Sequence, residues 1–354
     1  MRKKILSLLL SWALCALFVP IPAAQAVSTS ARCAILMEAS SGRVLYAQNE
    51  GEVHSIASIT KLLTALTAAE LCPDVDAPVT VDPAAVGAEG SSMYLTAGEV
   101  LPLRHLLYGL LLRSGNDAAN AIAIHCSGSV EAFAQAMNRT AQRLGMTHSH
   151  FMNPSGLEQE GHFSCAYDMA LCAQAFLAQP VLAEIAATKS VTLGTRTIQN
   201  HNKLLWSYSG CVGLKTGFTK KAGRTLVSAA TRGGTTLIAV TLNDGDDWRD
   251  HTALLDYGFS ICRSHLLCRA GKGLGLVAVS GSLVPAVRVE TQSDVRWCLT
   301  ADEAVTAKME LPRHVQAPVN RGQVLGSLTF YLNGQEIGRT AVVAAAAAPE
   351  NKKR

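Results

Sequence analysis

A lysine stands at the head of an apolar run, and its position constrains this chain more than any other feature. The apolar residues that follow Lys61 recur at spacings of three and four: Leu62, Leu63, Leu66 and Ala69. This spacing predicts a helix over residues 59–71. Ser58 and Lys61 are three residues apart, so on a helix they share one face, with Cβ atoms about 5 to 6 Å apart. We therefore expect a lysine amine within reach of a serine hydroxyl at the start of a buried helix.

A serine beside a lysine can be a nucleophile with its base. The hydroxyl becomes a useful nucleophile near neutral pH only when a base accepts its proton. Lysine can serve as that base when burial or a second cation lowers its pKa. The start of a helix also favours negative charge that develops during attack on a carbonyl. A serine and a lysine three apart also occur by chance in many chains, so for this pair alone an ordinary exposed helix is the first interpretation.

Two later motifs favour the catalytic interpretation. Ser114 and Asn116 stand where two helical patterns break, so they could project into a cleft. Lys215, Thr216 and Gly217 lie in a strand pattern, and a glycine leaves room for a peptide to dock along a strand edge. Lys215 could supply the second cation, and with Thr216 it could bind a terminal carboxylate. Taken singly, these motifs also fit an ordinary interhelical turn and a solvated strand end.

The N-terminal 26 residues have the pattern of a secretory signal peptide. A cationic start at 2–4 precedes an apolar stretch over 5–19 and a small-residue cleavage site at 24–26. We expect removal of this segment and action outside the cytoplasm, in the cell-wall space. An uncleaved anchor is the alternative, but the apolar stretch is shorter than the roughly 20 residues that cross a bilayer.

The body of the chain predicts an α+β domain over 27–263. Strands are expected as a hairpin within 33–50 turning at 40–42, and again over 191–200, 211–219, 224–234 and 235–244. Helices are expected over 103–114, 116–128, 130–145, 164–180, with Ser164 as N-cap, and 247–259. A small β domain is predicted over 264–343, with a hairpin turn at Asn333 and Gly334, and a disordered tail over 344–354. That tail is too short to span a membrane.

Charge and cysteine content exclude some classes of protein. A formal net charge of +4, without a basic run, does not favour nucleic-acid binding. Ten cysteines include Cys15 in the expected signal, which leaves an odd number without a CxxC pair. We therefore expect no disulfide framework and no zinc site, with most thiols buried as small apolar groups. Cys165 and Cys172, roughly 10 Å apart along one helix, cannot bridge.

Together the three motifs resemble those of the serine penicillin-recognising enzymes. The surrounding segments, including "ASITKLLTAL", "LLYGLLLRSGNDAANAIA", "MNPSGL" and "GLKTGFTKKAGRTLVSAA", resemble D-alanyl-D-alanine carboxypeptidases, the low-molecular-mass penicillin-binding proteins. The resemblance covers roughly residues 30–262 and, weakly, the β tail. It implies a β-lactamase/transpeptidase-like fold with an antiparallel sheet, covering helices and a helical subdomain, followed by the small all-β domain.

The resemblance also implies an activity and its residues. The expected reaction removes the terminal D-alanine from peptidoglycan pentapeptide stems, without a cofactor or metal, and β-lactams would bind covalently. Ser58 would form the acyl-enzyme, Lys61 would be the base, Ser114 would relay a proton and Asn116 would orient the substrate.

Other residues would form the substrate site. Lys215 and Thr216 would bind the substrate carboxylate on a strand that also contains Gly217 and Phe218. The backbone N–H groups of Ser58 and Phe218 would form the oxyanion hole.

Several positions depart from the family pattern. Relatives often have a histidine in the segment 153–157. The residue at the position of Phe218 varies among them and could tune the rate of deacylation. His201 stands where some members carry an arginine that assists carboxylate binding. Many relatives end in a membrane-anchoring helix that this sequence does not show, so we expect weak or absent membrane association.

Rival functions are weaker on the same residues. A class A β-lactamase would carry a Glu-x-x-Leu-Asn loop, which the sequence lacks. A non-catalytic wall-binding protein would be favoured by loss of the motif residues, and all are present. A zinc peptidase could draw on His148, His150, His162 and Asp168, but no HExxH motif occurs. A cysteine hydrolase would pair Cys165 with His162, on sequence proximity alone.

Overall fold

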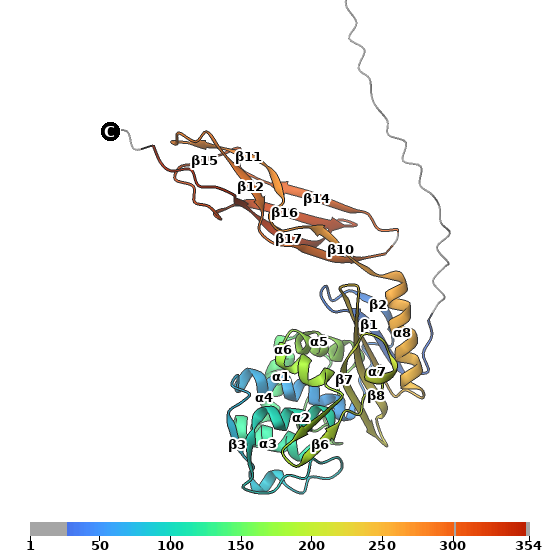
Figure 1. Cartoon of the computed structure of the whole chain (residues 1–354). Coiled ribbons are helices and arrows are strands. Elements are labelled where there is room, and N and C mark those ends of the chain that lie inside the picture. The colour runs from blue at the N-terminus through green and yellow to red at the C-terminus, as the bar shows by residue number, and fades with distance from the viewer. Residues whose placement is uncertain (1–26, 301, 352–354) are drawn as a thin grey trace, which may run out of the picture.

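The structure is a computed structural model that describes residues 27–300 and 302–351. The expected signal peptide at 1–26 lies outside the described residues. A sheet with covering helices forms one part of the molecule, and an elongated all-β part extends from the end of the last helix (Figure 1). The predicted α+β fold class with a C-terminal all-β domain is confirmed.

The central sheet has five antiparallel strands in the order β2-β1-β9-β8-β7. Its strands are β1 (Cys33–Glu38), β2 (Val44–Gln48), β7 (Cys211–Thr219), β8 (Gly223–Arg232) and β9 (Thr235–Leu242). The predicted hairpin at 40–42 joins β1 to β2. Strand β7 therefore forms one edge of the sheet, with one side of its backbone left without a partner strand.

Both faces of this sheet are covered, which explains why β1 is buried along its whole length. Successive side chains of a strand point to opposite faces. Cys33, Ile35 and Met37 accordingly join the large core beneath helices α1 to α6, whereas Ala34 and Leu36 join a second core beneath α8. A strand buried on both sides loses the alternation of polar and apolar residues that would otherwise mark it.

The helices are α1 (Lys61–Leu71), α2 (Leu103–Leu112), α3 (Asn116–Ser127), α4 (Val130–Arg143), α5 (Ala166–Leu177), α6 (Pro180–Ala187), α7 (Leu204–Ser207) and α8 (Asp247–Ile261), with 3-10 turns η1 (Ala57–Thr60) and η2 (Pro83–Ala85). Two short antiparallel pairs complete the domain: β3 (Pro78–Thr80) with β4 (Val100–Pro102), and β5 (Ser190–Leu193) with β6 (Arg196–Gln199).

The predicted helices occur, with corrections around α5. The N-cap of α5 is Cys165 rather than Ser164, and the helix ends at Leu177. The unpredicted α6 starts at Pro180, because proline fits the first turn of a helix. Among the described residues no single helix is long and apolar enough to cross a membrane; α5 and α6 meet that test only as a pair bent by 105°.

The C-terminal β part contains β10 (Arg263–Cys268), β11 (Gly273–Ser280), β12 (Ala286–Thr291), β13 (Val295–Leu299), β14 (Val305–Glu310), β15 (His314–Gln316), β16 (Val324–Leu332) and β17 (Gln335–Ala344). The predicted hairpin at Asn333 and Gly334 joins β16 to β17. The expected disordered tail is wrong at its start. Ala344 ends β17, and Ala348 is buried and pairs with Val319, because these alanines fill the core of this part.

A disulfide and an ion pair connect the two parts, and the disulfide corrects the expectation from the cysteine count. Cys262, at the end of α8, pairs with Cys298 on β13, with Cα atoms 5.6 Å apart. An odd total cannot exclude a single bridge between residues that only the fold brings together. Arg43, next to β2, also forms a bidentate ion pair with Glu303 of the C-terminal part, with Nη to Oε distances of 2.7 Å.

Gly258 of α8 provides a test of how closely this helix packs on the sheet. A Cβ at this position would lie 2.6 Å from Leu237 Cδ1 and 2.7 Å from Leu36 Cδ2. We expect Gly258→Ala to destabilise the protein by about 1 to 3 kcal/mol through overpacking, despite the better helix propensity of alanine. Thermal unfolding would measure this, with exposed Ser260→Ala in the same helix as the control. A more stable Gly258→Ala variant would contradict close packing here.

Candidate active site

Ser58 and Lys61 meet as their spacing predicts. Ser58 lies in η1, and Lys61 is the first residue of α1, which continues from that turn. The Lys61 Nζ is 2.9 Å from the Ser58 Oγ. Ala57, directly before the serine, has a φ of 48°, a left-handed conformation that costs an alanine free energy and is typical of functional sites. The chain therefore presents the hydroxyl at the start of a helix, beside a lysine amine.

The Lys61 amine is fully buried and has three oxygen neighbours. Besides the Ser58 hydroxyl, it lies 2.8 Å from the Asn116 Oδ1 and 2.5 Å from the Ser155 carbonyl oxygen. A neutral amine has two N–H groups and one lone pair. If its N–H groups donate to Asn116 and Ser155, its lone pair is left for the hydroxyl proton of Ser58. The geometry therefore matches a general base.

Electrostatics favour this neutral form. Burial lowers the pKa of Lys61 well below its usual value, and the nearby charge of Lys215 lowers it further, whereas Asp117 acts in the opposite direction. The second-cation effect expected from the sequence is therefore present, but burial is the larger cause. An amine in this environment can accept a proton near neutral pH.

Lys215 projects from β7 into the same region. Its residue lies opposite Val227 of β8, on the face of the sheet that carries the larger core. Only 1% of Lys215 is exposed, and its Nζ donates to the Thr216 carbonyl oxygen at 2.7 Å. Burial lowers the pKa of Lys215 to about 7, so this group is easily affected by any anion placed beside it.

A loop that the sequence analysis treated as structural supplies one of the contacts to Lys61. Asn153 Oδ1 accepts hydrogen bonds from the backbone N–H groups of Ser155, at 3.2 Å, and Gly156, at 2.8 Å. This fixes the Ser155 carbonyl that faces Lys61. Gly156 has a φ of 81°, and a Cβ there would overlap the Ala57 carbonyl, so only glycine lets the loop approach η1. The contact to Lys61 comes from a backbone carbonyl, which every residue has, so the sequence could not predict it.

The break between α2 and α3 presents the second motif as expected. Ser114 adopts a φ of 64°, and Asn116 begins α3, where its Nδ2 donates to the Glu89 carbonyl at 2.5 Å. One N–H of that amide remains for another acceptor.

Asp117, not singled out from the sequence, secures the neighbouring loop. Its buried carboxylate accepts from Met93 N and Leu95 N at 3.0 Å and from Ser92 Oγ at 2.6 Å. These bonds hold the loop that contains Ser91 against the start of α3. Asp117 therefore helps to shape the site without lying at its surface.

The edge of β7 passes close to the serine. A Cβ on Gly217 would lie 2.9 Å from Ser58 N and 3.1 Å from Ile59 N, so a side chain there would press on η1. Thr225, opposite Gly217 on β8, donates through its hydroxyl to the Ile56 carbonyl at 3.0 Å and ties the sheet to the same turn. The glycine predicted to admit a peptide therefore also lets strand and serine approach each other.

A pocket of about 600 Å³ opens at this junction. Its walls are Ser58, Ser91, Ser114, His201, Thr216, Gly217, Phe218, Arg224, Asp247 and Trp248. The structure thus brings the predicted site residues together: Lys61 and Asn116 contact each other behind Ser58, Lys215 is buried beside Thr216, and the others line the pocket. Phe218 is largely exposed at its mouth.

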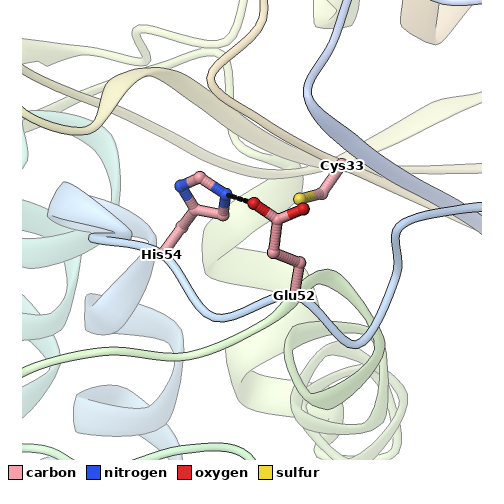
Figure 2. A group of neighbouring side chains, drawn as sticks. All are labelled: Cys33, Glu52 and His54. Atoms are coloured by element: carbon pink, nitrogen blue, oxygen red, sulfur yellow. Dashed lines mark hydrogen bonds and ion pairs between the residues drawn. The ribbon is translucent and has the colours of Figure 1, made fainter.

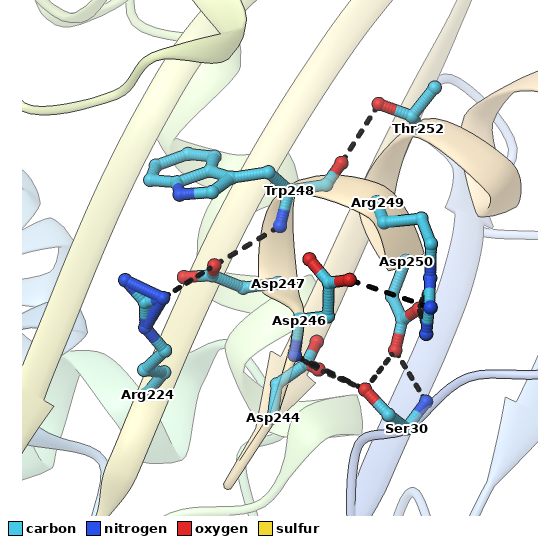
Figure 3. A network of polar contacts seen from close by, with 9 residues as sticks. All are labelled: Ser30, Arg224, Asp244, Asp246, Asp247, Trp248, Arg249, Asp250 and Thr252. Carbon is cyan, nitrogen blue, oxygen red and sulfur yellow. Dashed lines mark hydrogen bonds and ion pairs between the residues drawn. The ribbon is translucent and has the colours of Figure 1, made fainter.

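Arg224, Asp247 and Trp248 form a wall that the sequence analysis missed. Arg224 lies on β8 opposite Phe218, and its Nη1 is 3.5 Å from the carboxylate of Asp247 at the start of α8 (Figure 3). In the same network Ser30 Oγ donates to the Asp250 carboxylate at 2.7 Å and ties the N-terminal segment to α8. Only the fold brings β8 and α8 together, so the sequence held no local indication of this wall.

His201 lies in the pocket, but it is not a substitute for an arginine. Partial burial, then the charges of Lys215 and Arg113, lower the pKa of its imidazole. The ring is therefore neutral at neutral pH. Arg224, with its guanidinium group, is the cationic side chain among those lining this pocket.

One group of metal-ligating side chains among the described residues is Cys33, Glu52 and His54. Figure 2 shows the Glu52 carboxylate hydrogen-bonded to the His54 ring, with the Cys33 thiol beside the carboxylate. The Glu52 Oε1 lies 2.9 Å from His54 Nε2 and 3.0 Å from Arg32 Nη2. Burial, with a contribution from Glu52, raises the pKa of Cys33 to about 11. These contacts account for the three side chains, and we assign no metal to them.

The residues of the zinc-peptidase alternative do not assemble. His148 and Asp168 are close, with Cys165, but His162 lies elsewhere, where its Nε2 is 2.9 Å from Thr60 Oγ1. Burial lowers the pKa of His162 to about 4. The cysteine-hydrolase pairing also fails, because Cys165 caps α5 and burial raises the pKa of its thiol to about 12.

The sheet, the helical layer and the pairing of pocket-lining Ser58 with buried Lys61 are typical of serine acyl-transfer enzymes of the penicillin-recognising class. The family model for D-alanyl-D-alanine carboxypeptidases matches residues 21–246, and that for the C-terminal domain of penicillin-binding protein 5 matches 264–350. The chain belongs to the D-alanyl-D-alanine carboxypeptidase family. The resemblance predicted from the sequence is confirmed, as is the predicted enzyme class: serine-type carboxypeptidases that act on peptidoglycan stem peptides and bind β-lactams covalently.

Individual relatives match most of the chain. DacF of Bacillus subtilis is 31% identical over 89% of this chain and 85% of its own length. DacC of Escherichia coli is 32% identical over 90% of this chain and 84% of its own. Both are D-alanyl-D-alanine carboxypeptidases. The crystal structure of penicillin binding protein 5 from Haemophilus influenzae superimposes with a TM-score of 0.75 at 28% identity, covering 92% of this chain and 99% of that one.

The effect of Lys215 on Lys61 can be tested through the pH dependence of acylation. Lys215→Met removes a positive charge, so the pKa of Lys61 should rise and more of it should be protonated at a given pH. We expect the acidic limb of the acylation rate with a fluorescent penicillin to move to higher pH, each profile being scaled to its own maximum. Exposed Lys220→Met is the control. An unmoved limb in Lys215→Met would show that the two lysines are not coupled.

Proposed function

We propose that Ser58 is the nucleophile of this carboxypeptidase and Lys61 its general base. The observation that supports this assignment is the buried Lys61 Nζ, 2.9 Å from the Ser58 Oγ, with its two other neighbours both hydrogen-bond acceptors. In this reaction Ser58 Oγ attacks the carbonyl between the last two D-alanines and its proton passes to Nζ. The C–N bond then breaks, D-alanine leaves, and water hydrolyses the acyl-enzyme.

The motif of Ser114 and Asn116 would protonate the leaving group and bind the substrate amide. Ser114, which lines the same pocket as Ser58, relays a proton to the departing amine. Asn116 has one amide N–H left after its bond to Glu89, and this N–H donates to the substrate amide oxygen. The backbone N–H groups of Ser58 and Phe218 form the oxyanion hole, since β7 and η1 approach each other at Gly217.

A terminal carboxylate would bind at Lys215 and Thr216. Gly217 admits the peptide along the free edge of β7, as an added strand. We extend this site to Arg224, because it is a pocket-lining cation and His201 is neutral there. His201 then contributes a hydrogen bond and shape rather than charge, and exposed Phe218 packs over the bound stem and tunes deacylation.

We further propose that residues 27–263 form the catalytic domain and that 264–343 form a separate spacer or partner-binding module, with α8 and the disulfide at their junction. The protein would act outside the cytoplasmic membrane, where peptidoglycan stems are found; the signal-like pattern at 1–26 supports this. Weak or absent membrane association stays a prediction.

Ser58→Ala should abolish covalent labelling by a fluorescent penicillin, because no nucleophile remains to form the acyl-enzyme. Ser55→Ala is the matched control, since that hydroxyl precedes η1 and bonds to Glu158 instead. An unchanged circular dichroism spectrum would show that the fold is intact. Persistent labelling of Ser58→Ala would overturn the nucleophile assignment.

The substrate class is tested by incubating the mature protein with a pentapeptide stem and following its mass. We expect loss of one alanine with wild type and Ser55→Ala, and none with Ser58→Ala. Rapid hydrolysis of penicillin without trimming of the stem would instead favour the β-lactamase alternative.

The carboxylate site is tested by comparing stems that end in a free carboxylate with amidated ones. Lys215→Ala and Arg224→Gln should each lower kcat/KM for the free acid by about tenfold or more, because each removes a charged hydrogen bond worth about 1.5 to 3 kcal/mol. The amide should lose less. Arg232→Gln, on the same strand and paired with Asp256 at 3.2 Å, is the control. Equal losses on both substrates would argue against carboxylate binding.

A further inference from the structure

Two partly buried cysteines meet at the end of the helical layer opposite the active site. Cys72 caps the C-terminus of α1, and Cys126 is the penultimate residue of α3. Their Sγ atoms are 3.0 Å apart. A disulfide bond is about 2.05 Å long, so the two sulfurs need to approach by only about 1 Å to be joined.

We propose that Cys72 and Cys126 form a disulfide in the exported protein, one that locks the ends of α1 and α3 together beneath the active site. No other free thiol among the described residues lies within contact distance of a second free sulfur. Four of those cysteines are buried, which agrees with the expectation that most thiols serve as small apolar groups: Cys33, Cys165, Cys172 and Cys268.

The position of this pair indicates what the bond would do, which is to hold together the two helices that carry Lys61 and Asn116. α1 begins with Lys61 and α3 begins with Asn116, and these residues contact each other at 2.8 Å at the catalytic end. Eleven residues of α1, about 16 Å of helix, separate that contact from the cysteines. The bond would close a loop with a separation of 54 residues, and this loop contains Ser91 and Ser114 of the pocket. The disulfide would therefore stabilise the helices that position the site, without contacting the residues that react.

The chemistry requires an oxidant. Two thiols lose two protons and two electrons as the S–S bond forms, and a disulfide-containing partner such as oxidised glutathione is reduced to two thiols. Burial, then hydrogen bonding to Cys72, raises the pKa of the Cys126 thiol, so uncatalysed exchange is expected to be slow. In the cell the oxidant depends on the extracytoplasmic location proposed above. The test below supplies the oxidant itself and is independent of that location.

Peptide mapping tests the bond directly. The native mature protein is incubated at alkaline pH with a mixture of oxidised and reduced glutathione, free thiols are blocked with N-ethylmaleimide, and the protein is digested with trypsin without reduction. Cleavage after Lys61, Arg104, Arg113 and Arg139 leaves Cys72 in peptide 62–104 and Cys126 in peptide 114–139, each with one cysteine. We expect these two peptides to be linked to each other and to separate on reduction. Separate peptides carrying maleimide or glutathione would overturn the proposal.

Thermal stability tests the brace. In the oxidised state, wild type should unfold roughly 5 to 10 °C above Cys72→Ser, because the bond restricts the unfolded chain. After complete reduction the two should converge, since both lose the Cys262–Cys298 bond equally. Half-buried Cys211→Ser, which removes an unpaired thiol, should behave as wild type. Penicillin labelling at 25 °C confirms that each sample is folded, and equal unfolding temperatures for oxidised wild type and Cys72→Ser would contradict the brace.

Discussion

The proposed mechanism depends on one buried amine, that of Lys61, whose pKa its surroundings lower. Placing an ammonium group in a protein interior without a counter-charge costs several kcal/mol, so Lys61 in its fully buried position gives up its proton instead. The same burial that disfavours the charge makes the lone pair available to Ser58. In the proposed mechanism, packing of the core would therefore also activate the nucleophile, and the positive charge of Lys215 would add to this effect.

Three separate segments surround this amine, and each is held by bonds of its own. Asn116 arrives at the start of α3, which Asp117 fastens to the loop before it. Ser155 lies on a loop that the Asn153 side chain fixes, and Lys215 lies on β7. The sheet must approach η1 closely for this to happen, and Gly217 provides the space. The residues that position the site are thus spread over the domain and act through backbone geometry.

Local patterns in the sequence predict the parts of this site that depend on short-range geometry. The three-residue spacing of Ser58 and Lys61, the helix break at Ser114 and the strand around Lys215 all follow from local periodicity, and the structure shows each. The Ser155 carbonyl could not be predicted, since every residue carries one and only the fold selects it. Arg224 and Asp247, or Cys262 and Cys298, are distant in sequence and meet through packing. The disordered tail predicted from Ala344 onward is wrong at its start, because small apolar residues such as Ala344 and Ala348 suit a loose tail and a tight core alike.

With the roles proposed for them, the two lysines would also connect substrate binding with the protonation state of the base. With the pocket empty, burial holds the pKa of Lys215 near 7, so the group is only partly charged at neutral pH. A carboxylate seated beside it favours the ammonium form and raises that pKa. The fuller charge on Lys215 then disfavours a proton on Lys61, whereas the negative charge of the carboxylate favours one, and more strongly the closer it lies to Lys61. In the proposed site the two charges therefore act on Lys61 in opposite directions, so binding of the carboxylate and protonation of the base are linked through Lys215.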